Sequence, residues 1–247
     1  MSLTYKIEIP RRIMVLFFII DTSGSMDGSK IGAVNVAIEE VIPAIREVSD
    51  ENADAQIKIA ALEFSSGARW VTVSGPVEAD KFRWNYLDAS GVTDFGAACK
   101  TLNEKLSTKA FMQEATGSFA PAIFLLSDGE PTDDWQGALA TLKKNNWFKA
   151  AIKVAIAIGD DANKDVLKEF TGTMEAVMEI HNAAVLKKMI KFVSVTASKI
   201  ASKSSNVDSS TLGASAGDMQ KQQELNTCLQ EFAEDIATTR DNDQSDW

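Results

Sequence analysis

Cysteine and histidine are scarce in this chain of 247 residues, which contains two cysteines and one histidine. Cys99 and Cys228 lie far apart and in no spacing typical of a metal site, which argues against a disulfide framework and fits a reducing compartment. His181 has no acid and nucleophile suggested by its neighbouring sequence, so we assign it a structural role. Hydrolases built on a Ser-His-Asp or Cys-His arrangement are therefore not expected.

The chain also lacks an excess of positive charge and any apolar run long enough to cross a membrane. The net charge of −10 argues against nucleic-acid binding, because phosphates require a basic surface, and against binding to anionic membranes. The apolar run Ile13–Ile20 follows two arginines and imitates a signal peptide, but eight residues are too few to span a bilayer and no small-residue cleavage site follows. We therefore predict that this run is a buried strand of a cytoplasmic protein.

Nucleotide-binding motifs are absent as well, because the chain has neither a G-x-x-x-x-G-K-[ST] nor a G-x-G-x-x-G pattern. One enzyme class stays open as an alternative, a metal-dependent phosphotransferase or hydrolase that uses Asp21. Haloacid dehalogenase-type enzymes place a nucleophilic aspartate after a buried strand and need a second acid two residues later. Here Ser23 occupies that position, so we expect a binding module and no catalysis.

The chain does contain a regular alternation of short apolar segments and helical patterns. Ile13–Ile20 is apolar at every position, as in a central parallel strand, whereas residues 55–64 alternate and are predicted to form an antiparallel hairpin with residues 69–74. Repeated strand–helix units predict an α/β fold, doubly wound, with a mostly parallel central sheet, one antiparallel edge strand and helices on both faces. The other expected elements are strands at 120–130, 153–162 and 175–180, helices at 31–45, 135–148 and 183–200, and a loop that leads into a helix within 92–106.

Composition divides the chain into three parts. We predict one α/β domain over residues 1–203, a flexible Ser/Gly/Ala-rich linker over 204–217, and an acidic helix with a frayed tail over 218–247. An apolar stripe on the last helix can pack on this domain or on a partner, and we favour docking on the chain itself or within a complex. The stripe consists of Leu225, Cys228, Leu229, Phe232 and Ile236.

Acids follow the predicted parallel strands where these strands end, and this edge is where ligands bind in such sheets. In the segment DTSGS, Asp21, Ser23 and Ser25 offer three oxygen ligands from one short loop, and Gly24 lets the backbone turn so that they converge. Hard oxygen ligands favour Mg²⁺, Mn²⁺ or Ca²⁺. Asp128, after another buried strand, is placed to add charge directly or through water.

Other acids near this rim receive simpler interpretations. Asp94 is a predicted cap of the helix that follows it. Asp133 is expected to be a helix cap, a residue that supports a metal ligand without binding the metal, or a solvated charge. Asp160 and Asp161 lie near the end of the segment 153–162, after its apolar part, and we assign them to a solvated loop.

Three motifs occur in order along the chain: an apolar strand followed by D-x-S-x-S, the loop SGVTDFG, and an apolar strand ending in SDGE. Together they resemble the von Willebrand factor type A (VWA) domain over roughly residues 10 to 200. The resemblance implies a Rossmann-like fold with a metal-ion-dependent adhesion site (MIDAS). The ligands that it implies are Asp21, Ser23 and Ser25 from the first loop, Thr93 from the second and Asp128 from the third.

Within that family, the segments VLFFIIDTSGSMDGSKIGAVNVAI and MIKFVSVTAS are most similar to the TerY-like proteins of bacterial tellurite-resistance and stress clusters. One departure is Val92, where many relatives have a second glycine. The resemblance implies a metal-dependent interaction module in a bacterial stress-response or defence complex, in which a partner's Asp or Glu carboxylate binds the metal. We expect Mg²⁺ first, with Mn²⁺ and Ca²⁺ as alternatives, and a kinase or phosphatase of the same cluster as partner.

Overall fold

The computed structural model describes residues 11–113, 117–202 and 216–238. Its strands are β1 (Arg12–Asp21), β2 (Ala55–Ser65), β3 (Gly67–Trp70), β4 (Val77–Glu78), β5 (Ala122–Ser127), β6 (Ile152–Ile158) and β7 (Val177–Ile180). They form a seven-stranded sheet in the order β3-β2-β1-β5-β6-β7, with β4 paired to β2 beside this path. The β1–β2, β1–β5, β5–β6 and β6–β7 pairs are parallel, whereas β3 and β4 pair with β2 in the antiparallel sense.

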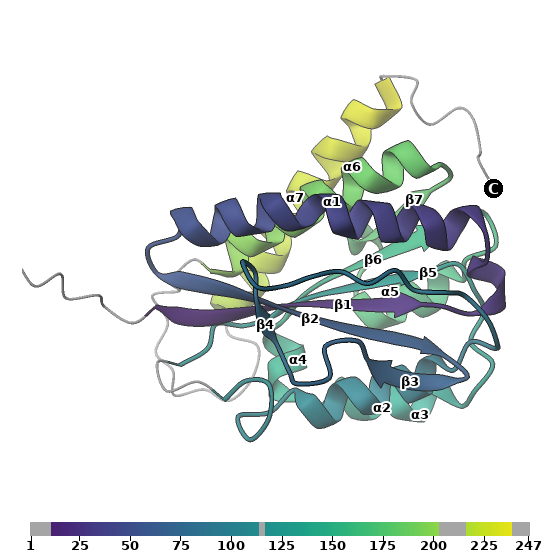
Figure 1. Ribbon diagram of the computed structural model, residues 1–247, viewed down its shortest axis with the longest axis horizontal. Helices are drawn as coiled ribbons and strands as arrows, with labels where there is room; N and C mark the ends of the chain where they lie inside the picture. The colour runs from purple at the N-terminus through teal and green to yellow at the C-terminus, as the bar shows by residue number, and fades with distance from the viewer. Residues whose placement is uncertain (1–10, 114–116, 203–215, 239–247) are drawn as a thin grey trace, which may run out of the picture.

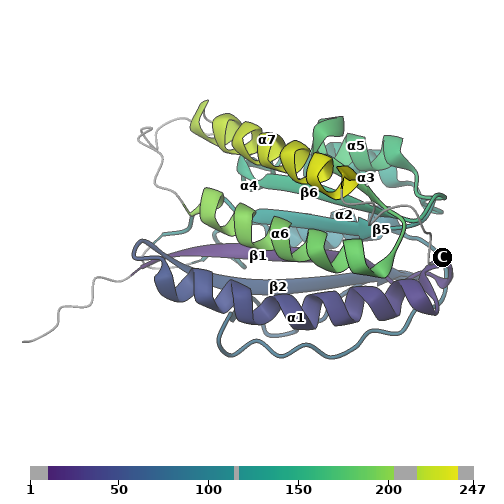
Figure 2. The same cartoon turned by 90° about the horizontal axis from the view of Figure 1, so that it is seen from above.

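Helices cover both faces of the sheet (Figure 1), and the view from above in Figure 2 shows the long helices of one face side by side. On this face lie α1 (Ser29–Glu51), α6 (Ala183–Ala201) and α7 (Ala216–Thr238). On the opposite face lie α2 (Phe95–Lys105), α3 (Trp135–Leu142), α4 (Asn146–Ala150) and α5 (Lys164–Thr171). None of the helices in the described ranges is long and apolar enough to cross a membrane.

The position of β1 explains why its segment is apolar throughout. Met14 and Phe18 belong to the core beneath α1 and α6, whereas Val15 and Phe17 belong to the core beneath α2 and α5. No residue from Ile13 to Ile20 is more than 4% exposed. A strand that is covered on both faces must be apolar at every position, so the predicted central strand and the doubly wound fold are confirmed.

The parallel register brings the carboxyl ends of β1 and β5 to the same edge. Ile20 of β1 pairs with Leu126 of β5, one residue before each strand ends. Asp21, the last residue of β1, and Asp128, the residue just after β5, therefore lie beside each other at this edge. The sheet topology thus joins two segments that are about 100 residues apart in the sequence.

Some predicted element boundaries are wrong. The antiparallel hairpin exists, but β3 begins and ends earlier than the predicted 69–74, and the single helix predicted over 135–148 is two helices. The side chain of Asn145 accepts a hydrogen bond from the backbone N of Trp147, which starts α4 as a separate helix. The short helix α5 was not among the expected elements.

The last helix packs on its own chain. Leu225 and Leu229 of α7 are fully buried in the same core as α1 and α6, and Phe232 stacks on Phe192 of α6 with ring centroids 4.1 Å apart. Residues 203–215, which include most of the predicted linker, and the end of the predicted tail lie outside the described residues. The division of the chain into three parts therefore stays a prediction.

A side-chain amide of α7 also bonds to the sheet. Gln222 Oε1 accepts a hydrogen bond from the backbone N of Lys153 (2.8 Å), and Gln222 Nε2 donates one to the carbonyl of Lys153 (3.1 Å). Lys153 lies near the start of β6, ahead of Ala155–Ile158, the part of this strand that pairs with β7. The Gln222 amide thus bonds to the strand as a neighbouring peptide group would.

Candidate metal centre

The first loop starts from Asp21, whose carboxylate is completely buried at the end of β1. Its Oδ1 accepts a hydrogen bond from the backbone N of Ser23 (2.8 Å), and its Oδ2 accepts one from the hydroxyl of Ser127 (2.6 Å). Two donors, one from the loop after β1 and one from the end of β5, therefore fix the orientation of this carboxylate. Ser127 lies outside the predicted ligand set, although its place directly before Asp128 at the strand end offered a signal.

The two serines of the loop connect β1 to the acid after β5. Ser23 Oγ lies 3.1 Å from Ser25 Oγ, and Ser25 Oγ donates a hydrogen bond to Oδ1 of Asp128 (2.7 Å). A 3₁₀ turn over Gly24–Met26 shapes the loop, and the Met26 side chain is buried beneath it. Ser23 and Asp128 are 1% exposed, whereas Ser25 is exposed, so the cluster opens to solvent on the Ser25 side.

The second loop brings Thr93 to the same cluster. A Cβ on Gly129 would lie 3.2 Å from Thr93 Oγ1 and 3.5 Å from Ser25 Oγ, so both hydroxyls face this glycine. The backbone N of Thr93 donates to the hydroxyl of Thr132 (3.0 Å), and the backbone N of Thr132 donates to the carbonyl of Thr93 (2.9 Å). Val92, the departure from the family pattern, is 47% exposed. The structure therefore brings the five predicted ligand residues together at one edge.

A lysine from the first turn of α1 completes the cluster. Lys30 Nζ lies 2.6 Å from Asp128 Oδ2, and these side chains are 13% and 0% exposed. Asp128 thus accepts one hydrogen bond from a hydroxyl and one from an ammonium group. Lys30 is also outside the predicted set, and the only signal for it was its place in the helix that follows the loop.

Burial determines the electrostatics of Asp21. Loss of water raises the pKa of this carboxyl, because the charged form is penalised, and the charge of Asp128 acts in the same direction. Hydrogen bonds from Ser127 and Ser23 lower the pKa of Asp21, but by less than burial raises it. A divalent cation beside both carboxylates would favour the charged form instead.

The donor set fits such a cation. It consists of two carboxylates and three hydroxyls, which are hard oxygen ligands of the kind that Mg²⁺, Mn²⁺ and Ca²⁺ prefer. The ammonium group of Lys30 already sits against one of the carboxylates as a positive charge. The residue at 129 is a glycine, and it leaves open the space between Thr93 and Ser25 that a Cβ would crowd.

The cap of α2 comes from another loop than predicted. Asp94 occupies the N-cap position, but its side chain makes no capping hydrogen bond and accepts one from the backbone N of Gly67 instead (2.8 Å). The carboxylate of Asp133 accepts hydrogen bonds from the backbone N atoms of Gly96 (2.8 Å) and Ala97 (2.9 Å). The prediction for Asp94 is therefore wrong, because its carboxylate is turned to the β2–β3 hairpin.

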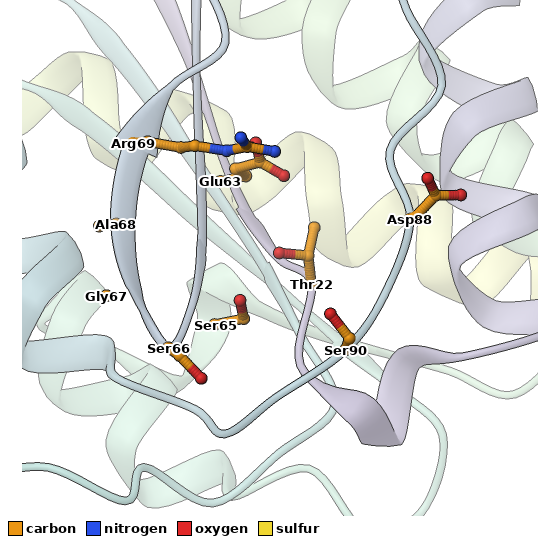
Figure 3. Close-up of a pocket in the computed structure, with 9 residues that line it drawn as sticks. All are labelled: Thr22, Glu63, Ser65, Ser66, Gly67, Ala68, Arg69, Asp88 and Ser90. Carbon is orange, nitrogen blue, oxygen red and sulfur yellow. The ribbon is translucent and has the colours of Figure 1, made fainter.

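A polar pocket of about 320 Å³ lies beside the cluster (Figure 3). It is lined by the β2–β3 hairpin on one side and by Thr22, Asp88 and Ser90 on the other. Arg69 of the hairpin forms an ion pair with Glu63 within this lining. None of the five predicted ligands lines this pocket, and the residue of the lining that is nearest to them in the sequence is Thr22, which directly follows Asp21.

A family model described as von Willebrand factor type A domain matches residues 16–192. The chain belongs to this family. The match confirms the resemblance that the three sequence motifs indicate, and the doubly wound α/β fold is the fold of its structural neighbours. No curated protein matches the VWA chain in a sequence search.

Solved structures share this VWA fold at low sequence identity. A von Willebrand factor type A protein from Catenulispora acidiphila matches with a TM-score of 0.58 and 20% identity, over 76% of this chain and 43% of that chain. The ArnB paralog VWA2 from Sulfolobus acidocaldarius matches with a TM-score of 0.53 and 18% identity, over 72% of this chain and 44% of that chain. Proximal thread matrix protein 1 from the mussel byssus, with a zinc-occupied MIDAS motif, matches with a TM-score of 0.52 and 17% identity, over 76% of this chain and 46% of that chain. At 20% identity or less these likenesses show the fold alone, and the match spans less than half of each of these chains.

Proposed function

We propose that this VWA domain is a metal-ion-dependent protein-interaction module. Asp21, Ser23, Ser25, Thr93 and Asp128 would hold a divalent cation, and an Asp or Glu carboxylate of a protein partner would take the coordination position left open. The observation that carries the proposal is the hydrogen-bonded chain from Ser23 through Ser25 to Asp128, which joins oxygen donors of two loops into one cluster.

The exposure pattern supports an open coordination position. Asp21, Ser23 and Asp128 are buried, whereas Ser25 reaches solvent, so a ligand can approach from one side only. A small divalent cation takes about six ligands and keeps water where protein groups are missing. The bound ion would keep residual positive charge, and this charge would attract a carboxylate even to a chain with a net charge of −10.

Mg²⁺ is the first candidate for this site, with Mn²⁺ and Ca²⁺ as alternatives, because the donors are all hard oxygens. The mussel protein with a zinc-occupied MIDAS motif supports the further view that a site of this kind accepts a transition metal. A metal titration of this chain therefore includes Zn²⁺ beside the three hard cations.

A metal-dependent phosphotransferase or hydrolase that uses Asp21 is the alternative. Asp21 is completely buried and both of its oxygens accept hydrogen bonds, which favours a ligand over a nucleophile. Ser23 stands where such an enzyme needs its second acid. Turnover of a phosphate ester that requires metal and disappears in Asp21→Asn would favour the alternative.

The finer part of the proposal is that the chain is TerY-like and acts in the cytoplasm, within a bacterial stress-response or defence complex. The likeness of residues 15–38 and 189–198 to such proteins supports it. A kinase or phosphatase would then be the candidate partner, with no nucleic acid and no membrane. Pull-downs from a bacterial lysate with Mg²⁺ and with chelator should differ, and identical partners in both would contradict metal-dependent binding.

Calorimetric titration of chelator-treated protein tests the site itself. Wild type should bind one Mg²⁺, the variant Asp21→Ala should not, and Asp27→Ala should bind as wild type does, because Asp27 is an exposed acid of the same loop. Acetate should tighten the binding of Mg²⁺ to wild type, since it mimics the partner's carboxylate. Binding by folded Asp21→Ala at the affinity of wild type would overturn the proposed ligand set.

A further inference from the structure

A second group of potential ligands lies at the same edge of the sheet, where β6 and β7 end. The backbone N of Gly159, just after β6, donates a hydrogen bond to the carbonyl of Ile180, the last residue of β7 (2.7 Å). This bond holds the turn after β6 against the end of β7. Asp160 and His181, the residues that follow Gly159 and Ile180, are thereby brought together.

Three side chains converge there. His181 Nδ1 lies 2.8 Å from Asp160 Oδ1, and His181 Nε2 lies 3.9 Å from Glu179 Oε1. One ligand atom of each residue can be chosen so that all three lie within 4.8 Å of one another. The side chains of Asp160, Glu179 and His181 are 73%, 36% and 25% exposed, so the group is open to solvent.

The sequence contained a signal for this arrangement. Glu179 and His181 are two residues apart at the end of a strand, and alternate residues of a strand lie on the same face. Ile180 between them is buried in the core beneath α6. The acid partners of His181 thus come from β7, the strand that it directly follows, and from the turn after the neighbouring strand.

We propose that Asp160, Glu179 and His181 form a second metal site, separate from the Asp21 cluster, for a zinc-class transition metal. One imidazole nitrogen with two carboxylate oxygens is a ligand set typical of Zn²⁺, whereas Mg²⁺ and Ca²⁺ favour oxygen donors alone. Three protein ligands leave a fourth tetrahedral position, and the exposure of Asp160 leaves that position accessible to water or to a ligand.

Lys164 limits the affinity of this site. Its Nζ lies 2.7 Å from Oε1 of Glu179, so the ammonium group occupies the carboxylate oxygen that a metal would need. Both side chains are more than one third exposed, and an exposed ion pair of this kind is weak enough to be displaced. Removal of the lysine charge should therefore strengthen metal binding. If Lys164 instead kept Glu179 in place for the metal, its removal would weaken metal binding.

Proton NMR tests the site directly in the full chain, because His181 is the only histidine and gives the only imidazole C–H resonances. The probes are ZnCl₂ and MgCl₂, added stepwise to chelator-treated wild type. Zn²⁺ should move the two imidazole resonances to new positions by about two equivalents, because the oxygen cluster is itself able to bind one, and Mg²⁺ should leave the resonances in place. Imidazole resonances that do not respond to Zn²⁺ up to several equivalents would overturn the proposal.

Zinc affinities of matched variants provide the second test. They are measured in the Asp21→Ala background, because the oxygen cluster is itself able to bind Zn²⁺. His181→Gln should weaken Zn²⁺ binding at least tenfold, Lys164→Met should strengthen it about threefold, and the control Asp161→Asn should leave it unchanged. Equal affinities in all four proteins would overturn the proposal, and circular dichroism confirms that each variant is folded. The Lys164→Met and NMR results decide the matter if His181→Gln does not fold.

Discussion

The ends of β1 and β5 and the ends of β6 and β7 lie on one edge of the same sheet, but their side chains are organised differently. At β1 and β5, Asp21 and Asp128 are buried, and all four of their carboxylate oxygens accept hydrogen bonds. At β6 and β7, Asp160 is 73% exposed and His181 adds a nitrogen donor. Burial explains the contrast, because a buried carboxylate must be held by protein donors, whereas water satisfies an exposed one.

The comparison separates what the fold determines from what the side chains determine. The parallel sheet places acids at one edge, while burial and neighbouring donors decide which cation each group suits. A hydrogen bond joins the two regions, since Asn163 after β6 donates to Glu130 after β5 (2.8 Å). The segments that follow β5 and β6 are therefore in contact, while the two groups differ in ligand chemistry.

The largest effect that we expect is a reciprocal loss of binding. Asp21→Ala should reduce Mg²⁺ affinity at least about 100-fold, because a buried charged ligand is removed, and should leave the Zn²⁺-induced shift of the His181 resonances intact. His181→Gln should leave Mg²⁺ affinity unchanged. Calorimetry and NMR on the two variants check this. A single variant that abolishes both Mg²⁺ binding and Zn²⁺ binding would show that the two regions form one site.

A smaller effect is expected from Gly129→Ala. Its methyl group would approach Thr93 Oγ1 to 3.2 Å, which is closer than ordinary contact, and should displace the threonine from the cluster. Mg²⁺ affinity should fall about tenfold, with no change at the β6–β7 group. Gly32→Ala is the matched control, because a Cβ on Gly32 meets nothing within 4 Å, and equal Mg²⁺ affinities of the two variants would contradict the role of Thr93.

Lys30→Met should change metal binding in the opposite direction. The ammonium group competes with a metal for Asp128, so its removal should raise Mg²⁺ affinity about fivefold, equivalent to about 1 kcal/mol. The same change should lower the stability of the metal-free protein, because Asp128 keeps a buried charge without its partner. Lys144→Met, at an exposed lysine, controls for net charge, and an unchanged or weaker Mg²⁺ affinity in Lys30→Met would contradict the competition.

The smallest effect is a pH dependence of stability confined to the buried cluster. Burial raises the pKa of Asp21, so in metal-free protein the folded state holds this proton more tightly than the unfolded state, whose pKa is about 3.9. The free energy of unfolding should therefore fall as pH rises from about 4 through the raised pKa. Urea titrations should show this fall in metal-free wild type, and it should disappear with Mg²⁺. A fall of the same size in Asp21→Asn would assign it to another group.

The fold and part of the site could be predicted from the sequence because they depend on local patterns. The unbroken apolar run before Asp21 identified the central strand, and the three oxygens of the loop after it lie within five residues of one another. Asp128 was predicted because it follows another buried strand, whereas Thr93 came only from the family resemblance, which depends on the order of the motifs and not on their contacts.

The remaining features depend on contacts between distant segments. Lys30 and Asp128 are 98 residues apart, and Ser127 and Asp21 are 106 residues apart, so no local pattern joins them. The cap of α2 was assigned to Asp94 because it directly precedes the helix, whereas the donors are satisfied by Asp133 from another loop. Asp160 and His181 were treated separately for the same reason.

The bond between Gln222 and β6 has a consequence for how the protein behaves at high concentration. A strand edge with free amide and carbonyl groups is a template on which a second molecule can add its own strand, and this is a common start of aggregation. The amide of Gln222 occupies both groups of Lys153 where β7 does not reach. Gln222 of α7 therefore closes this point of the β6 edge to a strand of another molecule.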